Sequence, residues 1–412
     1  MKIGLIAYHA ASNFGASLQL LSTFSFFKNK GDEPIIINWV ANDFEDFYKV
    51  RTSKDQEECL LNFRNNYWEE TSLCRTSNEV AKVIEKEGIE AVVIGSDAVA
   101  QNFYPFYVLP KYKIGLINTP TSDRRFPNVF WGTFIPYLKK EIPVVVMSAS
   151  SQDSPFKTFS KEVCEQMREH IKRYAYCSVR DSWTQEMFKH VTLGEVTPKV
   201  TPDPVFAFNA NVSSMIPSRE EILKKFGLPE KYFVLSFLAK PAVSQSWLTN
   251  FEKLANEKGI TCVMLPFSYK KSLGTTKQSI DLPLSPIDWY SIIKYSAGYI
   301  GHNMHPIVVS LTNDVPFFSF DNYGRARVKN LFTNESSSKI KHILSLADML
   351  DYRVSCLNRF YVAPKPEFVL EKVLAFDNTK TRKFRTEYYE KYVDMMNDIV
   401  KVLETQLVKY NK

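Results

Sequence analysis

The side chains best suited to acid–base chemistry lie in a short polar loop, GHNMHP, at residues 301–306. We expect a short apolar strand before it, at 297–300, and a helix after it, with Pro306 in the first turn, where its missing N–H costs nothing. His305 would then lie at the carboxyl end of a strand and beside a helix N-terminus. Open α/β sheets bind ligands there, and free N–H groups attract anions. Such a histidine either transfers protons or binds an anion in a cleft, or it only caps its own helix.

Two more polar side chains follow apolar strands in the N-terminal half. Asp97 ends the run AVVIGSD, and Arg180 follows the run YCSV. A carboxylate at a strand end either binds substrate or caps the next helix, and both alternatives stay open. An arginine there suits a carboxylate or phosphate ligand, and the alternative is a structural ion pair of the Arg180–Asp181 type.

The first strand of the chain, at 2–8, leads into a loop of small and polar residues and then into a helix. Leu18, Leu21 and Phe24 fall on one face of that helix. Gly15 lets a ligand or another part of the backbone approach closely. Because the loop contains neither GxGxxG nor a Walker lysine, the sequence does not support dinucleotide or P-loop nucleotide binding.

These polar residues are positioned by an alternation of strand and helix patterns that runs through both halves of the chain. The alternation predicts an α/β fold of two doubly wound, Rossmann-like domains. We place the first domain at 1–208, the second at 209–378 and a C-terminal helix at 379–412. Residues 42–80 show no clear periodicity.

The C-terminal helix combines a basic start with an apolar stripe. The stripe includes Met396, Ile399 and Leu403, and the basic residues include Lys380 and Arg385. An amphipathic helix usually buries its apolar face against its own protein. The alternative is a helix lying on a membrane surface.

Composition restricts the class of protein. The net charge of +7 is small and dispersed over 412 residues, which does not indicate nucleic-acid binding. The six cysteines form no CxxC pair, so neither a disulfide framework nor a zinc cluster is indicated. Pro306 keeps His302 and His305 in a loop, which argues against a metal site. With no signal peptide or long apolar run, we expect a soluble cytoplasmic protein, with peripheral contact at the inner membrane surface as the alternative role of the helix.

Five short motifs, taken together in their order and spacing, resemble the polysaccharide pyruvyl transferase family. They are NFGASLQ at 13–19, IGSD at 94–97, SVRD at 178–181, DP at 203–204, and His305 followed by SL at 310–311 and VP at 315–316. The resemblance implies two Rossmann-like domains facing a cleft, as in glycosyltransferase-B enzymes. It also implies transfer of the pyruvyl group of phosphoenolpyruvate to two hydroxyls of one sugar, forming a cyclic ketal. The acceptor would belong to a surface polysaccharide precursor, often carried on a lipid.

The resemblance also implies roles for individual residues. His305 would serve in acid–base transfer or hold the leaving phosphate, Arg180 would hold the donor's carboxylate or phosphate, and Asp97 would orient an acceptor hydroxyl. The residues expected to bind substrate are Asn13, Gly15, Ser96, Asn303, Met304 and Arg325. Phosphoenolpyruvate is a donor substrate, so no cofactor and no metal are expected. A small trianion needs cations and N–H donors around it.

The chain departs from the family at Asn303, where some members carry an arginine and others a serine. One cation is therefore missing, and Lys294, His302 or Arg325 are the candidates to replace it. Two rival functions stay open. One is a nucleotide-sugar-dependent glycosyltransferase of the same architecture, which would use Asp321 and Arg325. The other is a noncatalytic sugar-binding relative.

Overall fold

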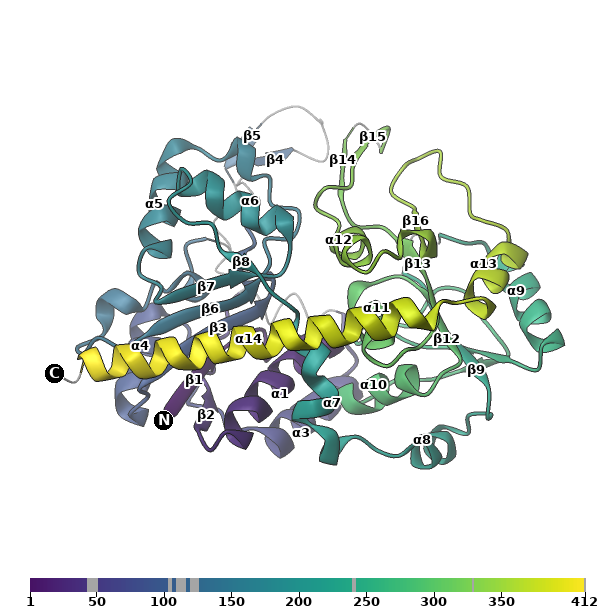
Figure 1. Cartoon of the computed structure of the whole chain (residues 1–412), viewed down its shortest axis with the longest axis horizontal. Helices are drawn as coiled ribbons and strands as arrows, with labels where there is room; N and C mark the ends of the chain where they lie inside the picture. The colour runs from purple at the N-terminus through teal and green to yellow at the C-terminus, as the bar shows by residue number, and fades with distance from the viewer. Residues whose placement is uncertain are drawn as a thin grey trace.

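The computed structural model describes residues 1–42, 51–102, 106–108, 116–118, 126–238, 242–327 and 330–410. Each half of the chain contributes one parallel six-stranded sheet, and a long helix runs across both halves (Figure 1). The fold is therefore α/β with two doubly wound units, as the alternating sequence patterns predict.

The first sheet has the strand order β2-β1-β3-β6-β7-β8, and every neighbouring pair is parallel. Its strands are β1 (Lys2–Ile6), β2 (Glu33–Ile36), β3 (Ala91–Asp97), β6 (Val144–Ala149), β7 (Tyr176–Val179) and β8 (Lys199–Val200). The helices of this half are α1 (Phe14–Asn29), α3 (Lys54–Tyr67), α4 (Ser77–Glu87), α5 (Lys161–Ile171), α6 (Ser182–Val191) and α7 (Phe208–Asn211). The central strands β3 and β6 are buried throughout, as their Val-rich runs predict for parallel strands covered on both faces.

The second sheet repeats this plan with the order β11-β10-β9-β12-β13-β16, again parallel throughout. Its strands are β9 (Tyr232–Ser236), β10 (Thr261–Met264), β11 (Gln278–Ser279), β12 (Gly298–Gly301), β13 (Phe317–Asp321) and β16 (Arg353–Ser355). The helices are α8 (Arg219–Phe226), α9 (Gln245–Glu257), α10 (Pro286–Lys294), α11 (Met304–Thr312), α12 (Lys339–Leu346), α13 (Pro366–Leu374) and α14 (Asn378–Tyr410). Two antiparallel pairs lie outside the sheets: β4 (Phe106–Val108) with β5 (Leu116–Asn118), and β14 (Arg325–Arg327) with β15 (Phe332–Asn334).

One apolar core is shared by the two halves. It combines Val93 of the first sheet and Tyr299 of the second with side chains of α1, α10, α11 and α14. Because side chains alternate between the faces of a strand, Val92 points the other way, into a core formed with α4, α5 and α6. Phe318 likewise points away, into a third core with α9 and α13. The shared core places the carboxyl ends of both sheets beside the same interface.

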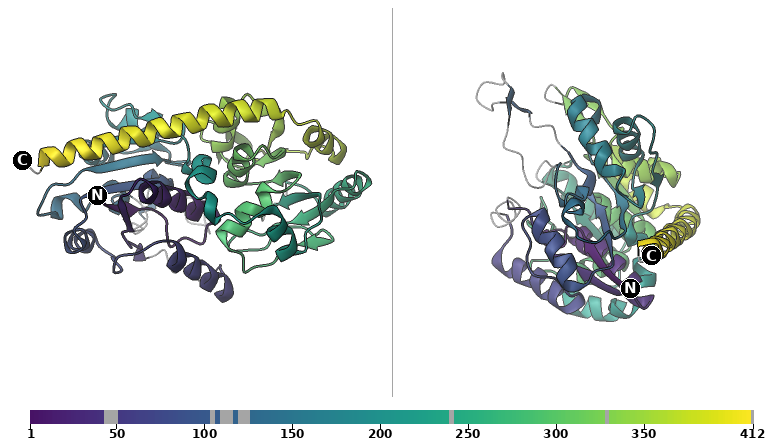
Figure 2. Two further views of the ribbon diagram at one scale, coloured as in Figure 1. Left: turned by 60° about the horizontal axis from the view of Figure 1, so that its bottom comes forward. Right: turned by 90° about the vertical axis from the view of Figure 1, so that its left-hand side faces the viewer.

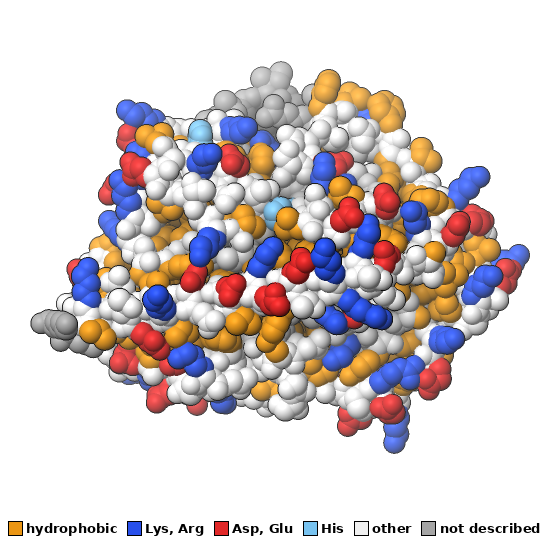
Figure 3. All heavy atoms as spheres, in the orientation of Figure 1, with side chains coloured by type: hydrophobic (Ala, Val, Ile, Leu, Met, Phe, Trp, Pro, Cys, Tyr) orange, Lys and Arg blue, Asp and Glu red, His pale blue; other side chains and the backbone are white. Residues whose placement is uncertain are grey.

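Helix α14 joins the two halves by packing along both of them, as the left view of Figure 2 shows. Its stripe is buried at Met396, Ile399 and Leu403, so in the structure the helix covers its own protein. The basic start is paired, with Arg385 on Asp314 at 2.6 Å. Figure 3 shows that the outward face of α14 carries basic and acidic side chains intermixed. Among the helices of the described residues, none combines the length and the apolar composition needed to cross a membrane.

Two pairs of polar contacts also hold the halves together. The hydroxyl of Ser12 donates to the carbonyl of Ser268 at 3.1 Å, and the hydroxyl of Ser268 donates to the carbonyl of Ser12 at 2.5 Å. The side-chain amide of Gln56 donates to the carbonyl of Leu284 at 2.9 Å and accepts from its N–H at 2.7 Å. Gln56 lies on α3, in the segment that shows no periodicity. A buried polar residue on the inner face of α3 hides the amphipathic pattern that would reveal this helix.

Candidate active site

His305 lies at the carboxyl end of the second sheet, as expected, but on a helix rather than in a loop. β12 ends at Gly301, and α11 begins at Met304, after Asn303 with a φ of 79°. Pro306 is the third residue of the helix, and it is tolerated because the first four N–H groups of a helix have no partner within it. His302 points elsewhere: it is fully buried, and its Nδ1 accepts from the N–H of Leu238 at 3.2 Å.

The imidazole of His305 crosses the interface and lies against the N-terminal half. It packs on the backbone of Gly15, near the start of α1. Its Nε2 is 3.9 Å from Oδ2 of Asp203 and has no hydrogen-bond partner among the described residues. Burial lowers the pKa of His305 below its ordinary value, against the opposing pull of Asp203 and Asp97. A neutral imidazole beside carboxylates can accept a proton and have the resulting cation stabilised.

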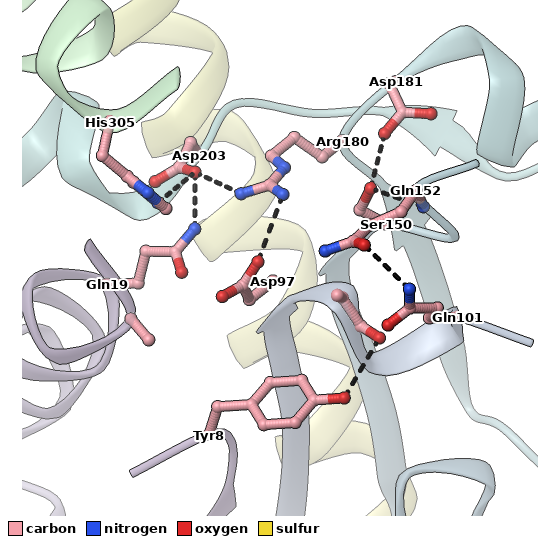
Figure 4. A network of polar contacts seen from close by, with 12 residues as sticks. Tyr8, Gln19, Asp97, Gln101, Ser150, Gln152, Arg180, Asp181, Asp203 and His305 are labelled. Carbon is pink, nitrogen blue, oxygen red and sulfur yellow. Dashed lines mark hydrogen bonds and ion pairs between the residues drawn. The ribbon is translucent and has the colours of Figure 1, made fainter. Parts of the chain in front are cut away.

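Asp203 is the centre of a buried polar network that faces His305 (Figure 4). Its Oδ2 accepts from the side-chain amide of Gln19 at 2.5 Å and from Nη1 of Arg180 at 2.7 Å. The other end of the guanidinium reaches Oδ1 of Asp97 at 3.4 Å. Arg180 is 2% exposed and Asp203 1%, so this network lies in a low-dielectric interior where its charges interact strongly.

Arg180 takes the structural role that its sequence position allows. It forms a structural ion pair, but with Asp203 and Asp97 rather than with Asp181. Asp181 instead caps α6, accepting from the N–H of Thr184 at 2.8 Å. The Nε of Arg180 lacks a hydrogen-bond partner within the described part of the chain. One donor of this buried guanidinium is thus left unused by the described residues.

Asp97 has an unusual backbone conformation, with φ at 79° and ψ at −156°. Such a conformation costs a non-glycine residue about 1–3 kcal/mol and is found mainly at functional sites. Its side chain caps no helix, so the capping alternative does not apply. Burial alone would raise the pKa of Asp97, but Arg180 and Lys339 outweigh it and hold that pKa below its ordinary value.

The remaining predicted residues divide into two groups. Gly15 lies within the site, and Ser96 directly precedes Asp97 on β3, where its buried hydroxyl has no partner among the described residues. Asn13 caps α1 by accepting from the N–H of Ala16 at 3.3 Å. Met304 is buried in the shared apolar core. Arg325 lies on β14, where its charge acts on Asp153.

Two residues of the polar network were not predicted to be part of the site. Gln19 and Asp203 stand inside the quoted motifs, but nothing local shows that they meet across the first domain. Lys339, the first residue of α12, was not predicted either, and its charge acts on both Asp97 and His305. It is 6% exposed, and its Nζ lies 5.7 Å from the centre of the Tyr323 ring. The sequence signal near it is Ser338, a residue type that favours a helix start and that caps α12 in the structure.

Two of the candidates for the missing cation, Lys294 and His302, already have other surroundings. Lys294 donates to Oδ1 of Asn209 at 3.0 Å, and His302 is enclosed in the second domain. Asp321, which a nucleotide-sugar enzyme would use, is fully buried. Its carboxylate accepts from Arg353 at 2.6 Å and from the hydroxyl of Ser338 at 2.5 Å. This carboxylate is therefore already engaged within the protein.

Comparisons with known proteins bear on the family and on the fold. A family model described as polysaccharide pyruvyl transferase matches residues 13–323, a segment that runs from the start of α1 past His305. No match was found among curated proteins. Among solved structures, a UDP-N-acetylglucosamine 2-epimerase from Rickettsia bellii is 13% identical. The match covers 100% of this chain and 97% of that one, with a TM-score of 0.51.

A UGT transferase from Siraitia grosvenorii in complex with UDP is 12% identical to this chain. The match covers 98% of this chain and 99% of that one, again with a TM-score of 0.51. At such identities the likeness concerns the fold alone. The fold is that of glycosyltransferase-B enzymes and related epimerases, with two Rossmann-like halves and a long C-terminal helix.

Proposed function

This chain belongs to the polysaccharide pyruvyl transferase family, and from that premise we propose that it moves the pyruvyl group of phosphoenolpyruvate onto two hydroxyls of a saccharide. The product is a cyclic ketal on a surface polysaccharide precursor. The observation that carries the proposal is the position of His305. Its imidazole comes from one half of the chain and faces Arg180 and Asp203 of the other half across the interface.

The reaction balances without a cofactor. The CH2 carbon of the enol gains one proton and becomes a methyl group. The central carbon forms bonds to two sugar oxygens, and its bond to the phosphate oxygen breaks. Of the two protons that the hydroxyls lose, one is matched by the proton on the methyl group and the other by the proton on the released phosphate. Proton transfer by a positioned side chain therefore contributes at several points.

His305 is the group we assign to these transfers. Its lowered pKa keeps it neutral near pH 7, so that it can take a proton from an attacking hydroxyl. Asp203 then stabilises the imidazolium, which passes its proton to the CH2 carbon of the enol or to the leaving phosphate. Arg180 supports the donor's anionic groups through its unpartnered Nε, and Asp97, held rigidly at the end of β3, orients an acceptor hydroxyl.

The nucleotide-sugar alternative has less support from the side chains. It requires a carboxylate free to bind ribose hydroxyls in the second half. Asp321, the residue in that place, is enclosed and bonded to Arg353 and Ser338. A noncatalytic sugar-binding relative has no need of a buried histidine whose Nε2 faces a carboxylate without bonding to it.

The test measures donor binding and turnover separately. Thermal shift with phosphoenolpyruvate and with a panel of nucleotide-sugars identifies the donor, because a ligand that binds the folded state raises the melting temperature. Phosphate release with a panel of saccharides then reports turnover. We expect stabilisation by phosphoenolpyruvate, and turnover that His305→Gln reduces about 100-fold or more.

His190→Gln is the matched control, since His190 is an exposed histidine of the same chain. It should leave both measurements unchanged. Stabilisation by a nucleotide-sugar and not by phosphoenolpyruvate would contradict the proposal in favour of the glycosyltransferase. If His305→Gln bound the donor and kept its full turnover, His305 would have no role in the proton transfers.

A further inference from the structure

Lys339 is a buried cation without a carboxylate partner. The residue is 6% exposed, yet among the described residues its Nζ forms no hydrogen bond or ion pair, and it lies 5.7 Å from the centre of the Tyr323 ring. Burying an ammonium group without a paired anion is costly. The neighbouring Lys341, two residues along the same helix, is ordinary by comparison: it is exposed and pairs with Glu335 at 3.6 Å. The carboxylates of Asp97, Asp181 and Asp153 act on Lys339 only from a distance, so its ammonium group is available to an anion.

One contact and two electrostatic interactions relate Lys339 to the candidate active site. The hydroxyl of Tyr323, whose ring lies under Nζ, donates to Oδ1 of Asn303 at 3.5 Å. Asn303 stands at the start of the helix that carries His305. The charge of Lys339 also acts on Asp97 and on His305 itself. Lys339 thus reaches the surroundings of Asn303 from a helix that is distant in sequence.

The start of α12, where Lys339 lies, is held against the first half of the chain. The hydroxyl of Ser337 donates to Asp153 at 2.8 Å, and the hydroxyl of Ser182 contacts Nδ1 of His342 at 3.3 Å. Ser338 caps the helix by accepting from the N–H of Lys341 at 3.0 Å. The free N–H groups of a capped helix start add a further positive potential. An anion beside Lys339 would therefore also lie beside a helix start that these hydrogen bonds attach to the first half of the chain.

We propose that Lys339 is an anion-binding residue of the active site, which holds the donor's phosphate or carboxylate from the second half while Arg180 holds it from the first. This assignment rests on the proposed function for the identity of the donor, but not for the presence of an anion site. Lys339 would supply the positive charge that is missing at Asn303. It does so from α12, and Tyr323 connects the two residues, because its ring lies under Nζ of Lys339 and its hydroxyl donates to Asn303. The two cations would then clamp one ligand from opposite sides of the interface.

The experiment compares Lys339→Met with Lys341→Met in titrations of phosphoenolpyruvate, inorganic phosphate and pyruvate. Losing one charge-assisted contact should raise the Kd of phosphoenolpyruvate about 10- to 100-fold in Lys339→Met. Lys341→Met should bind like the parent protein. The two small anions show which group of the donor Lys339 binds. Weaker phosphate binding in Lys339→Met assigns Lys339 to the phosphate group, and weaker pyruvate binding assigns it to the carboxylate.

The melting temperature of the ligand-free protein separates a binding role from a structural one. Because Lys339 is buried without a paired anion, Lys339→Met should melt no lower than the parent protein, while Lys339→Arg should retain part of the affinity. Unchanged affinity in Lys339→Met would overturn the inference, and so would a lower melting temperature with no rescue by arginine. If the parent protein did not bind phosphoenolpyruvate but bound phosphate in a Lys339-dependent way, the proposed function would be wrong and the anion site would be confirmed.

Discussion

The imidazole of His305 packs so closely on Gly15 that a Cβ at residue 15 would overlap ring atoms of the histidine. The two residues belong to different halves of the chain and lie 290 positions apart in the sequence. Glycine is thus required at position 15 by a contact across the interface, and not by the backbone conformation at that position. The absence of a side chain at 15 is what lets the catalytic candidate approach Asp203.

Gly15→Ala should therefore disturb both stability and turnover. The added methyl group must displace the imidazole, and overpacking of this kind costs about 1–3 kcal/mol in the free energy of unfolding. A displaced catalytic group should lower turnover about 100-fold. Urea denaturation and phosphate release measure the two effects. In Gly15→Ala/His305→Ala the overlap is gone, so the stability loss should be smaller than the sum of the two single losses; additive losses would contradict the contact.

Asp203→Ala should be among the most destabilising substitutions in the site. It removes the carboxylate that pairs with Arg180 and accepts from Gln19, leaving both donors buried. Breaking a buried ion pair on one side costs about 3–5 kcal/mol. The matched control is Asp398→Ala, which breaks an exposed pair with Lys199 and should cost less than about 1 kcal/mol. Equal losses in urea denaturation would show that the Asp203 network contributes little.

The pH dependence of turnover should report His305. The neutral imidazole is the active form, and burial lowers its pKa, so kcat should stay high at neutral pH and fall only below pH 6.5. Asp203 raises the pKa of His305, which means that Asp203→Asn should move the falling limb to still lower pH. Profiles of kcat at saturating donor test this. A limb that moved to higher pH would contradict the assignment.

Donor affinity should fall on the alkaline side because of Lys339. Burial and the charge of Arg180 lower the pKa of Lys339 to about 8, while Asp97, Asp181 and Asp153 oppose the shift. Above that pH the ammonium loses its proton, so the affinity for phosphoenolpyruvate should weaken between about pH 7 and pH 9. The guanidinium of Lys339→Arg stays charged throughout this range, so its titration curve should be flat. Isothermal titration at several pH values distinguishes the two curves, and a parent curve as flat as that of the variant would contradict the expectation.

Helix α14 should contribute strongly to the stability of the whole chain. Met396 is fully buried in the core that both halves share, so Met396→Ala should cost about 2–5 kcal/mol. Val408→Ala, near the end of the same helix, removes a side chain that is 60% exposed and should be nearly neutral. A single cooperative transition in both variants would show that the halves unfold together, whereas two separated transitions in the parent protein would contradict a shared core.

Much of the architecture is determined by local sequence patterns. The Val-rich runs that become β3 and β6 predict buried parallel strands because helices cover both faces of such a sheet. His305 could be placed at a strand end because Pro306 marks the first turn of the next helix. These patterns repeat at short range, so they can be read without knowledge of the folded chain.

Only the tertiary structure decided which polar residues meet. Gln56 interrupts the inner face of α3, because its partner is the backbone of Leu284, and no local pattern anticipates a hydrogen bond that spans two domains. Lys339 looks like a surface lysine in the sequence, as Lys341 is. It becomes buried because α12 docks its first turn against the other half of the chain through Ser337 and Asp153. Periodicity determines which face of an element is apolar, but the charge environment of one side chain depends on elements that are brought together only when the two sheets pack around a common core.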